Sequence, residues 1–179
     1  MIGRGLVKGK AWIGGEFMGE WDVFFAAELG TAGALAGLIM VAISINVSRI
    51  LAIPYLPGRA AETLVTPTGV LVVSSYALVP HQPAWLFASE ILFTGFLMWL
   101  VPSVIQFRAV RSGLHKDYAT RVIVARVALT QFSSLPFIAT GILLYQGVPG
   151  ALYWMVPGVI VSLVATVLNA WVMLVEILR

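Results

Sequence analysis

Residues 26–50 form one long apolar segment, AAELGTAGALAGLIMVAISINVSRI, which contains a single acid, Glu28, and has Arg49 near its end. A run of about 20 apolar residues is long enough to cross the hydrocarbon core of a bilayer as an α-helix. The segment therefore predicts a membrane-spanning helix, and the rest of the chain has to fold around it in the same environment.

The composition agrees with a membrane protein. Of the 179 residues, 60% are hydrophobic and 11% are charged, whereas about a quarter of the residues of a soluble domain are charged. The chain has no cysteine, which excludes disulfides and thiolate metal sites. His81 and His115 lack the spacing of metal ligands, so no metal or cofactor is expected. The few basic residues lie in loops and make no nucleic-acid surface.

Apolar segments occur five times, at about residues 23–48, 61–79, 84–107, 122–145 and 151–177. The second is the weakest, because Arg59 and Glu62 stand at its start and Pro67 favours a kink. It is interpreted as a full crossing, with a short or re-entrant helix as the alternative. The predicted fold class is an all-α membrane protein, a bundle of about five transmembrane helices.

Two parts of the chain are predicted. Residues 1–20 contain scattered glycines and no continuous apolar region, which argues against a cleavable signal peptide. They are interpreted as an interfacial or loose arm. Residues 21–179 form a single transmembrane helical domain, because no soluble stretch between the spans is long enough to fold alone.

The distribution of Lys and Arg predicts the orientation, since basic residues near helix ends stay on the cytoplasmic side. With five spans, the first loop, the third loop and the C-terminus share one side. That side holds Arg49, Arg59, Arg108, Arg111, Lys116, Arg121, Arg126 and Arg179. The other side holds Arg4, Lys8 and Lys10, all in the arm. We therefore expect the N-terminus outside and the C-terminus inside.

Two acids, Glu28 and Glu90, are predicted at similar depth in the outer leaflet, each about five or six residues into its span. A carboxylate inside the membrane needs a partner or water. If the two acids meet, they form a candidate polar site for a cation or a shared proton. In the alternative, each acid is hydrogen-bonded within the bundle, and the candidate partners are Thr31, Ser89, Thr94 and Tyr76.

A second group of polar residues is expected at the inner end of the bundle. Asn46 follows Glu28 by five helical turns and lies on the same face. Ion pairs of Glu176 with Arg49 or Arg126 would neutralise charges there. The group is interpreted either as an inner gate or as a cluster of polar contacts that locks helices together. Its members are Asn46, Arg49, Arg126, Asn169 and Glu176.

Glycines and hydroxyl side chains mark two further features. Gly30, Gly33 and Gly37 fall near one face of the first span, and glycines allow helices to approach closely, so helix packing is predicted there, either within the protomer or around an assembly axis. The fourth span carries a polar midsection followed by Pro136. Its hydroxyl groups either satisfy the carbonyls that the proline frees or line a water-filled cavity. The midsection comprises Thr130, Gln131, Ser133 and Ser134.

No motif predicts catalysis. The N-terminal glycines are not followed by the Gly-Lys-Ser/Thr of a phosphate-binding loop. No Ser/His/Asp set and no pair of metal-binding histidines is present. The chain is therefore expected not to be an enzyme, with intramembrane catalysis as the less favoured alternative.

Two stretches carry a resemblance to known proteins. SINVSRILAIPYLPGRAAETL, with the turn at Pro80, and LYWMVPGVIVSLVATVLNAWVMLVEI resemble a family of small bacterial polytopic membrane proteins, some of them labelled modulator of FtsH protease. The resemblance covers residues 21–178 and implies a multi-pass protein of the bacterial plasma membrane, without catalytic residues to carry over. GALAGLIMVAISIN is also similar to the pore helix of Orai-type calcium channels, although here the helix runs in the opposite direction.

Two functions of different class are compatible with these features. One is a homo-oligomeric channel or transport-like protein for cations or protons, with the first span near its axis. The other is an accessory or regulatory membrane subunit that docks on a larger membrane complex. Both imply the lipid bilayer and a homo-oligomer or larger complex as partners, and neither implies a cofactor.

Overall fold

The computed structural model describes residues 15–111 and 120–178, and these residues form helices and short turns without a strand. The predicted all-α fold is confirmed. The predicted arm lies mostly outside the described residues, and its last part, from Gly15, already belongs to the first helix. The elements are α1 (Gly15–Ile45), α2 (Val47–Ala52), α3 (Leu56–Ala77), α4 (Ala84–Arg111), α5 (Thr120–Tyr145), the 3₁₀ turn η1 (Ala151–Trp154) and α6 (Met155–Leu178).

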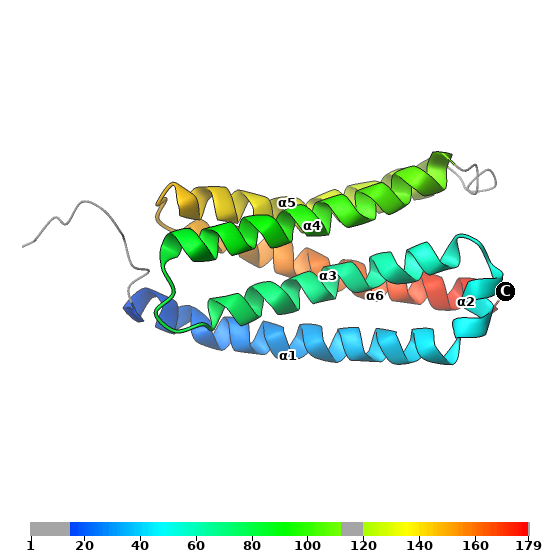
Figure 1. Cartoon of the computed structure of the whole chain (residues 1–179), viewed down its shortest axis with the longest axis horizontal. Coiled ribbons are helices and arrows are strands. Elements are labelled where there is room, and N and C mark those ends of the chain that lie inside the picture. Colours follow the sequence, from blue (N-terminus) through cyan, green and yellow to red (C-terminus); the bar gives the residue numbers. More distant parts are fainter. Residues whose placement is uncertain (1–14, 112–119, 179) are drawn as a thin grey trace, which may run out of the picture.

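Five long helices run side by side along the long axis of the molecule (Figure 1). In this view α1 and α3 lie below, α4 and α5 lie above, and α6 runs behind and between them. α3 contacts α1, α4 and α6, whereas α4 packs mainly on α5. α3 is thus the central helix, and α1 lies at the edge of the bundle.

Four of these helices are long and apolar enough to cross a membrane: Trp21–Ile45, Ala84–Arg111, Val124–Tyr145 and Ala151–Val175. The chain is an integral membrane protein. α3 has 22 residues, or about 33 Å at 1.5 Å per residue, and it runs from one end of the bundle to the other (Figure 1). Glu62, Thr63 and Ser74 are buried against neighbouring helices, so α3 crosses the bundle as a fifth helix although it is less apolar than the other four.

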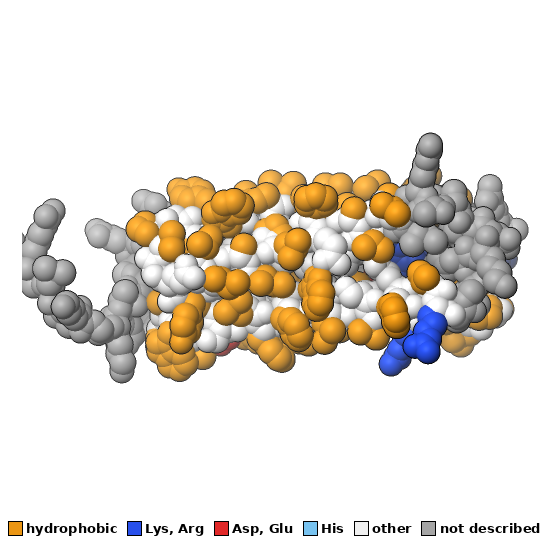
Figure 2. Space-filling model, turned by 90° about the horizontal axis from the view of Figure 1, so that it is seen from above, with side chains coloured by type: hydrophobic (Ala, Val, Ile, Leu, Met, Phe, Trp, Pro, Cys, Tyr) orange, Lys and Arg blue, Asp and Glu red, His pale blue; other side chains and the backbone are white. Residues whose placement is uncertain are grey.

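The start of α1 and the C-terminus lie at opposite ends of the bundle, as an odd number of crossings requires (Figure 1). Arg49 in α2 and Arg108 and Arg111 in the last turn of α4 lie at the C-terminal end. On the face shown in Figure 2, the Arg side chains that belong to the described residues lie towards that end. This segregation agrees with the predicted orientation, and the side of the membrane itself stays a prediction.

Two glycines bring the backbones of α4 and α5 close together. A Cβ on Gly141 would lie 2.5 Å from Cγ and 3.0 Å from the backbone nitrogen of Leu92. A Cβ on Gly95 would lie 3.0 Å from Cβ of Phe137 and 3.1 Å from the backbone nitrogen of Ile138. Only glycine lets the two backbones approach this closely.

Two of the three glycines of α1 make no close contact within the protomer. A Cβ on Gly30 or Gly37 would meet nothing within 4 Å, and one on Gly33 would meet only Cδ1 of Leu71, at 3.7 Å. Within the protomer, Gly30 and Gly37 therefore pack against no described helix. The reason is the rotation of α1, which turns Phe25, Ala32 and Ile39 into the bundle and the opposite face outward. We call the exposed residues Ala27, Gly30, Ala34 and Gly37 the small-residue seam.

Candidate functional site: a buried polar centre

Glu62 is a buried acid inside the bundle, with 4% of its surface exposed. Pro57, in the first turn of α3, is well suited to start a helix because it needs no hydrogen-bonded N–H there. Since α3 begins at Leu56, Glu62 lies about 9 Å along the helix from its first residue. The acid is thus carried into the bundle, where a lone carboxylate would be strongly unfavourable.

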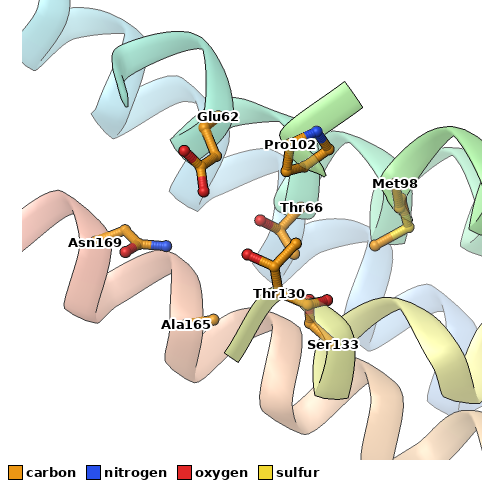
Figure 3. A pocket seen from close by; sticks show the side chains of 8 residues that line it. All are labelled: Glu62, Thr66, Met98, Pro102, Thr130, Ser133, Ala165 and Asn169. Carbon is orange, nitrogen blue, oxygen red and sulfur yellow. The ribbon is translucent and has the colours of Figure 1, made fainter. Parts of the chain in front are cut away.

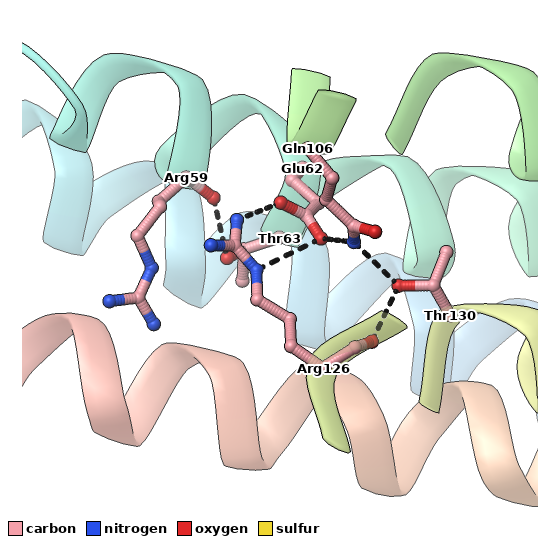
Figure 4. A network of polar contacts seen from close by, with 6 residues as sticks. All are labelled: Arg59, Glu62, Thr63, Gln106, Arg126 and Thr130. Atoms are coloured by element: carbon pink, nitrogen blue, oxygen red, sulfur yellow. Dashed lines mark hydrogen bonds and ion pairs between the residues drawn. The ribbon is translucent and has the colours of Figure 1, made fainter. Parts of the chain in front are cut away.

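Arg126 of α5 neutralises Glu62. The guanidinium donates from Nε to Oε1 of Glu62 at 3.2 Å and from Nη2 to Oε2, so both carboxylate oxygens are engaged (Figure 4). The side chains are 15% and 5% exposed, respectively. A bidentate pair fixes distance and angle, and its charge-assisted hydrogen bonds are stronger than neutral ones.

Gln106 and Thr130 complete the network. Nε2 of Gln106 donates to Oε1 of Glu62 and to Oγ1 of Thr130, the latter at 3.0 Å (Figure 4). The Thr130 hydroxyl donates to the backbone carbonyl of Arg126 at 3.1 Å. We call Glu62, Gln106, Arg126 and Thr130 the polar centre. It ties α3, α4 and α5 together through side chains alone.

A small cavity of about 10 Å³ lies beside the polar centre (Figure 3). Besides Glu62 and Thr130, its polar lining includes Thr66 of α3, Ser133 of α5 and Asn169 of α6. One water molecule needs about 10–15 Å³ and two to four polar partners. The cavity thus has room for about one water, and it places α6 next to the polar centre.

Hydroxyl groups in the polar midsection of α5 donate hydrogen bonds to backbone carbonyls, and some of these residues also line the cavity. Ser133 and Ser134 each donate to the carbonyl of Thr130 at 2.9 Å. The Ser162 hydroxyl of α6 donates to the carbonyl of Ser133 at 3.3 Å. Nε1 of Trp99 donates to Oε1 of Gln131 at 2.7 Å, which adds a second link between α4 and α5. Thr130 and Ser133 also line the cavity, whereas the carbonyl of Phe132, from which Pro136 removes the helical donor, is not among these acceptors.

The structure brings together only part of the predicted inner group. Arg126 belongs to the polar centre, and Asn169 lines the adjoining cavity. The acid that pairs with Arg126 is Glu62, and the side chain of Glu176 lies outside the described side chains. Asn46 donates to the carbonyl of Ala42 at 2.9 Å, at the break between α1 and α2. Arg49 is exposed on α2.

The two predicted outer acids have different environments. Glu90 accepts a hydrogen bond from Nε2 of Gln82, in the turn before α4. Oε2 of Glu28 is buried and has no hydrogen-bond partner among the described residues. α1 packs mainly on α3, and α4 mainly on α5. No hydrogen bond joins Glu28 and Glu90 in the described part of the chain, and two of the four candidate partners donate elsewhere, Thr31 to Ala27 and Ser89 to Trp85.

Glu62 and Gln106 are the residues that sequence reasoning missed. The apolar pattern starts this span at residue 61, which puts Glu62 at the end of the helix, where a carboxylate can reach water. A charged residue inside a membrane helix is by default a candidate site. Had Pro57 been used as the helix start, Glu62 would have stood one and a half turns inside the span, where its need for a cation is evident.

The polar centre has a limited chemical repertoire. Its carboxylate is engaged by three donors, its guanidinium faces that carboxylate, and the adjoining cavity has room for about one water. This arrangement holds three helices in one geometry and leaves little space for a substrate. No protein-family model, no curated protein and no solved structure matches the chain.

Proposed function

We propose that the chain is an accessory or regulatory membrane subunit that docks through the small-residue seam of α1 onto a transmembrane helix of a larger complex. The observation that carries the proposal is the position of the seam, which faces away from the bundle. The bacterial plasma membrane, implied by the resemblance of residues 21–178, is the proposed setting.

The packing of α1 supports this proposal. α1 buries the smallest share of its span, 11% against 28–33% for the other three apolar spans. In lipid, helices associate through close van der Waals packing, for which small residues at four-residue spacing are favourable. Gly30 and Ala34 have this spacing, and both are exposed. The free face therefore has the shape that a partner helix needs.

The channel alternative has less support. A pathway through one protomer would have to pass the polar centre, where Glu62 is neutralised and the cavity is about 10 Å³. A pathway between protomers would place the seam at the axis. Residues two apart on a helix point about 200° apart, so Glu28 faces away from an axis lined by Gly30. A cation site formed by Glu28 at that axis is not favoured by this geometry.

Replacing Gly37 with Leu tests the docking. A Cβ at this position would meet nothing within 4 Å in the protomer, and Leu is favoured over Gly in a helix by up to about 1 kcal/mol, so the protomer should stay folded. The wild type, extracted mildly from its native membranes, should migrate with one other chain in fixed stoichiometry. Gly37→Leu and Gly30→Leu should release it as a protomer, whereas Ala125→Leu, at an exposed position of α5, should not.

Two results would overturn the proposal. If the complex contains copies of this chain only, and cation flux into liposomes is lost in Glu28→Gln or Glu90→Gln, the homo-oligomeric channel replaces it. If wild type and Gly37→Leu both migrate as the free protomer, the seam is not a docking surface.

A further inference from the structure

A groove of about 390 Å³ runs between α3 and α4. Its floor includes Gly69 and Met98, which are buried, and its rim includes Thr68, Phe93 and Leu97, which are exposed. The groove therefore opens outward, towards the surrounding bilayer. Its volume falls within the range of about 300–1,000 Å³ that is typical of small-molecule sites.

The lining of the groove is mostly apolar and suits a hydrocarbon chain. It contains no charged residue, and its polar side chains are two threonines and one tyrosine. Along α3 it extends from Ala61 to Tyr76, a rise of about 22 Å. One leaflet of the hydrocarbon core is about 15 Å thick, half of the core's about 30 Å. The groove is thus long enough for an extended acyl chain.

Basic residues stand beyond one end of the groove. Arg108 follows Val101, a lining residue, by two helical turns and lies on the same face of α4, with Arg111 one turn further. Both arginines are exposed. α4 has 28 residues, or about 42 Å, which exceeds the hydrocarbon core of about 30 Å. The last turns of α4 therefore reach the headgroup region, where arginine meets phosphate.

Among the described side chains, the acid beside the groove, Glu62, does not oppose an anion at this end. Glu62 follows the lining residue Ala61, but it points to the polar centre and is neutralised by Arg126. Clusters of basic residues at the cytoplasmic ends of transmembrane helices bind anionic lipid headgroups. An apolar groove that ends beneath two arginines has the charge pattern of such a lipid.

We propose that the groove between α3 and α4 is a binding site for one anionic phospholipid, with an acyl chain along Thr68, Leu97 and Met98 and the phosphate at Arg108 and Arg111. The site is separate from the seam on α1 and does not depend on the docking proposal. The occupancy of this site depends on how much anionic phospholipid the surrounding membrane contains.

The test is lipid retention by the purified full chain, measured by native mass spectrometry with phosphatidylglycerol and with phosphatidylcholine. The wild type should retain one phosphatidylglycerol. Thr68→Phe and Ala61→Phe, which fill the groove from its exposed edge, should reduce retention at least tenfold. Val124→Phe, exposed on α5 and outside the groove, is the matched control and should leave retention unchanged.

The headgroup contact has its own test. Each arginine near the membrane surface contributes about fivefold to binding of an anionic lipid, so Arg108→Gln with Arg111→Gln should remove about 25-fold of the preference for phosphatidylglycerol. Equal retention by wild type and Thr68→Phe would overturn the groove as the site. An unchanged lipid preference in the double arginine variant would overturn the headgroup contact and therefore the proposal as stated.

Discussion

Arg126→Leu is expected to destabilise the protein by about 3–5 kcal/mol, because removing one member of a buried ion pair leaves the other charge uncompensated. Among its contacts with described residues, Glu62 would keep only the hydrogen bond from Gln106, at a position that is 4% exposed. The measurement is the free energy of unfolding in mild detergent or bicelles. The loss should be larger than for Trp99→Phe, which removes a neutral hydrogen bond between α4 and α5.

The double variant Glu62→Gln/Arg126→Leu distinguishes a charge effect from a packing effect. Replacing both members of a buried pair by uncharged residues is often close to neutral. We therefore expect the double variant to recover most of the stability that Arg126→Leu loses. If the double variant is as unstable as the sum of the two single variants, the ion pair is not what makes Arg126 necessary.

Gly141→Leu is expected to disrupt the contact between α4 and α5, because even a Cβ at this position would lie 3.0 Å from the backbone nitrogen of Leu92. Adding a side chain to a packed interface costs about 1–3 kcal/mol, and here the two backbones have to separate. The thermal midpoint of the purified protein and helix pairing measured by cysteine cross-linking would report the loss. The absence of native cysteines leaves the introduced thiols as the only ones.

Gly37→Leu is the matched control, since it makes the same substitution at a glycine where an added Cβ would meet nothing within 4 Å. Compared as isolated protomers, Gly37→Leu should have a thermal midpoint equal to or above that of the wild type. An equal loss of stability in Gly141→Leu and Gly37→Leu would contradict the packing described for α1 and α4.

Hydrophobicity was sufficient to predict the helices but not their neighbours. Four of the five predicted spans correspond to helices long and apolar enough to cross a membrane, and the remaining span, residues 61–79, corresponds to α3. Glu28 and Glu90 were placed at similar depth from residue counts alone. Depth says nothing about which helices are adjacent, and α1 packs mainly on α3 whereas α4 packs mainly on α5. Adjacency depends on packing that no single span encodes.

The glycines show a similar limit. The spacing of Gly30, Gly33 and Gly37 identifies a face that allows close approach, yet the bundle covers the opposite face of α1. Gly95 and Gly141, which do bring two helices together, stand alone in their spans and form no visible pattern. Which glycine is used depends on how each helix is rotated, and that is set by the larger side chains around it.

The central position of α3 also has a consequence for the order of events during synthesis. A charged residue at the centre of a membrane helix costs about 2.5–3.5 kcal/mol on insertion, and α3 contains Glu62 before its partners exist. Gln106 and Arg126, which satisfy that acid, belong to helices that follow it in the chain. A newly made α3 is therefore poorly suited to lipid until α4 and α5 have been made. For this helix, entry into the bilayer and tertiary folding form one coupled process.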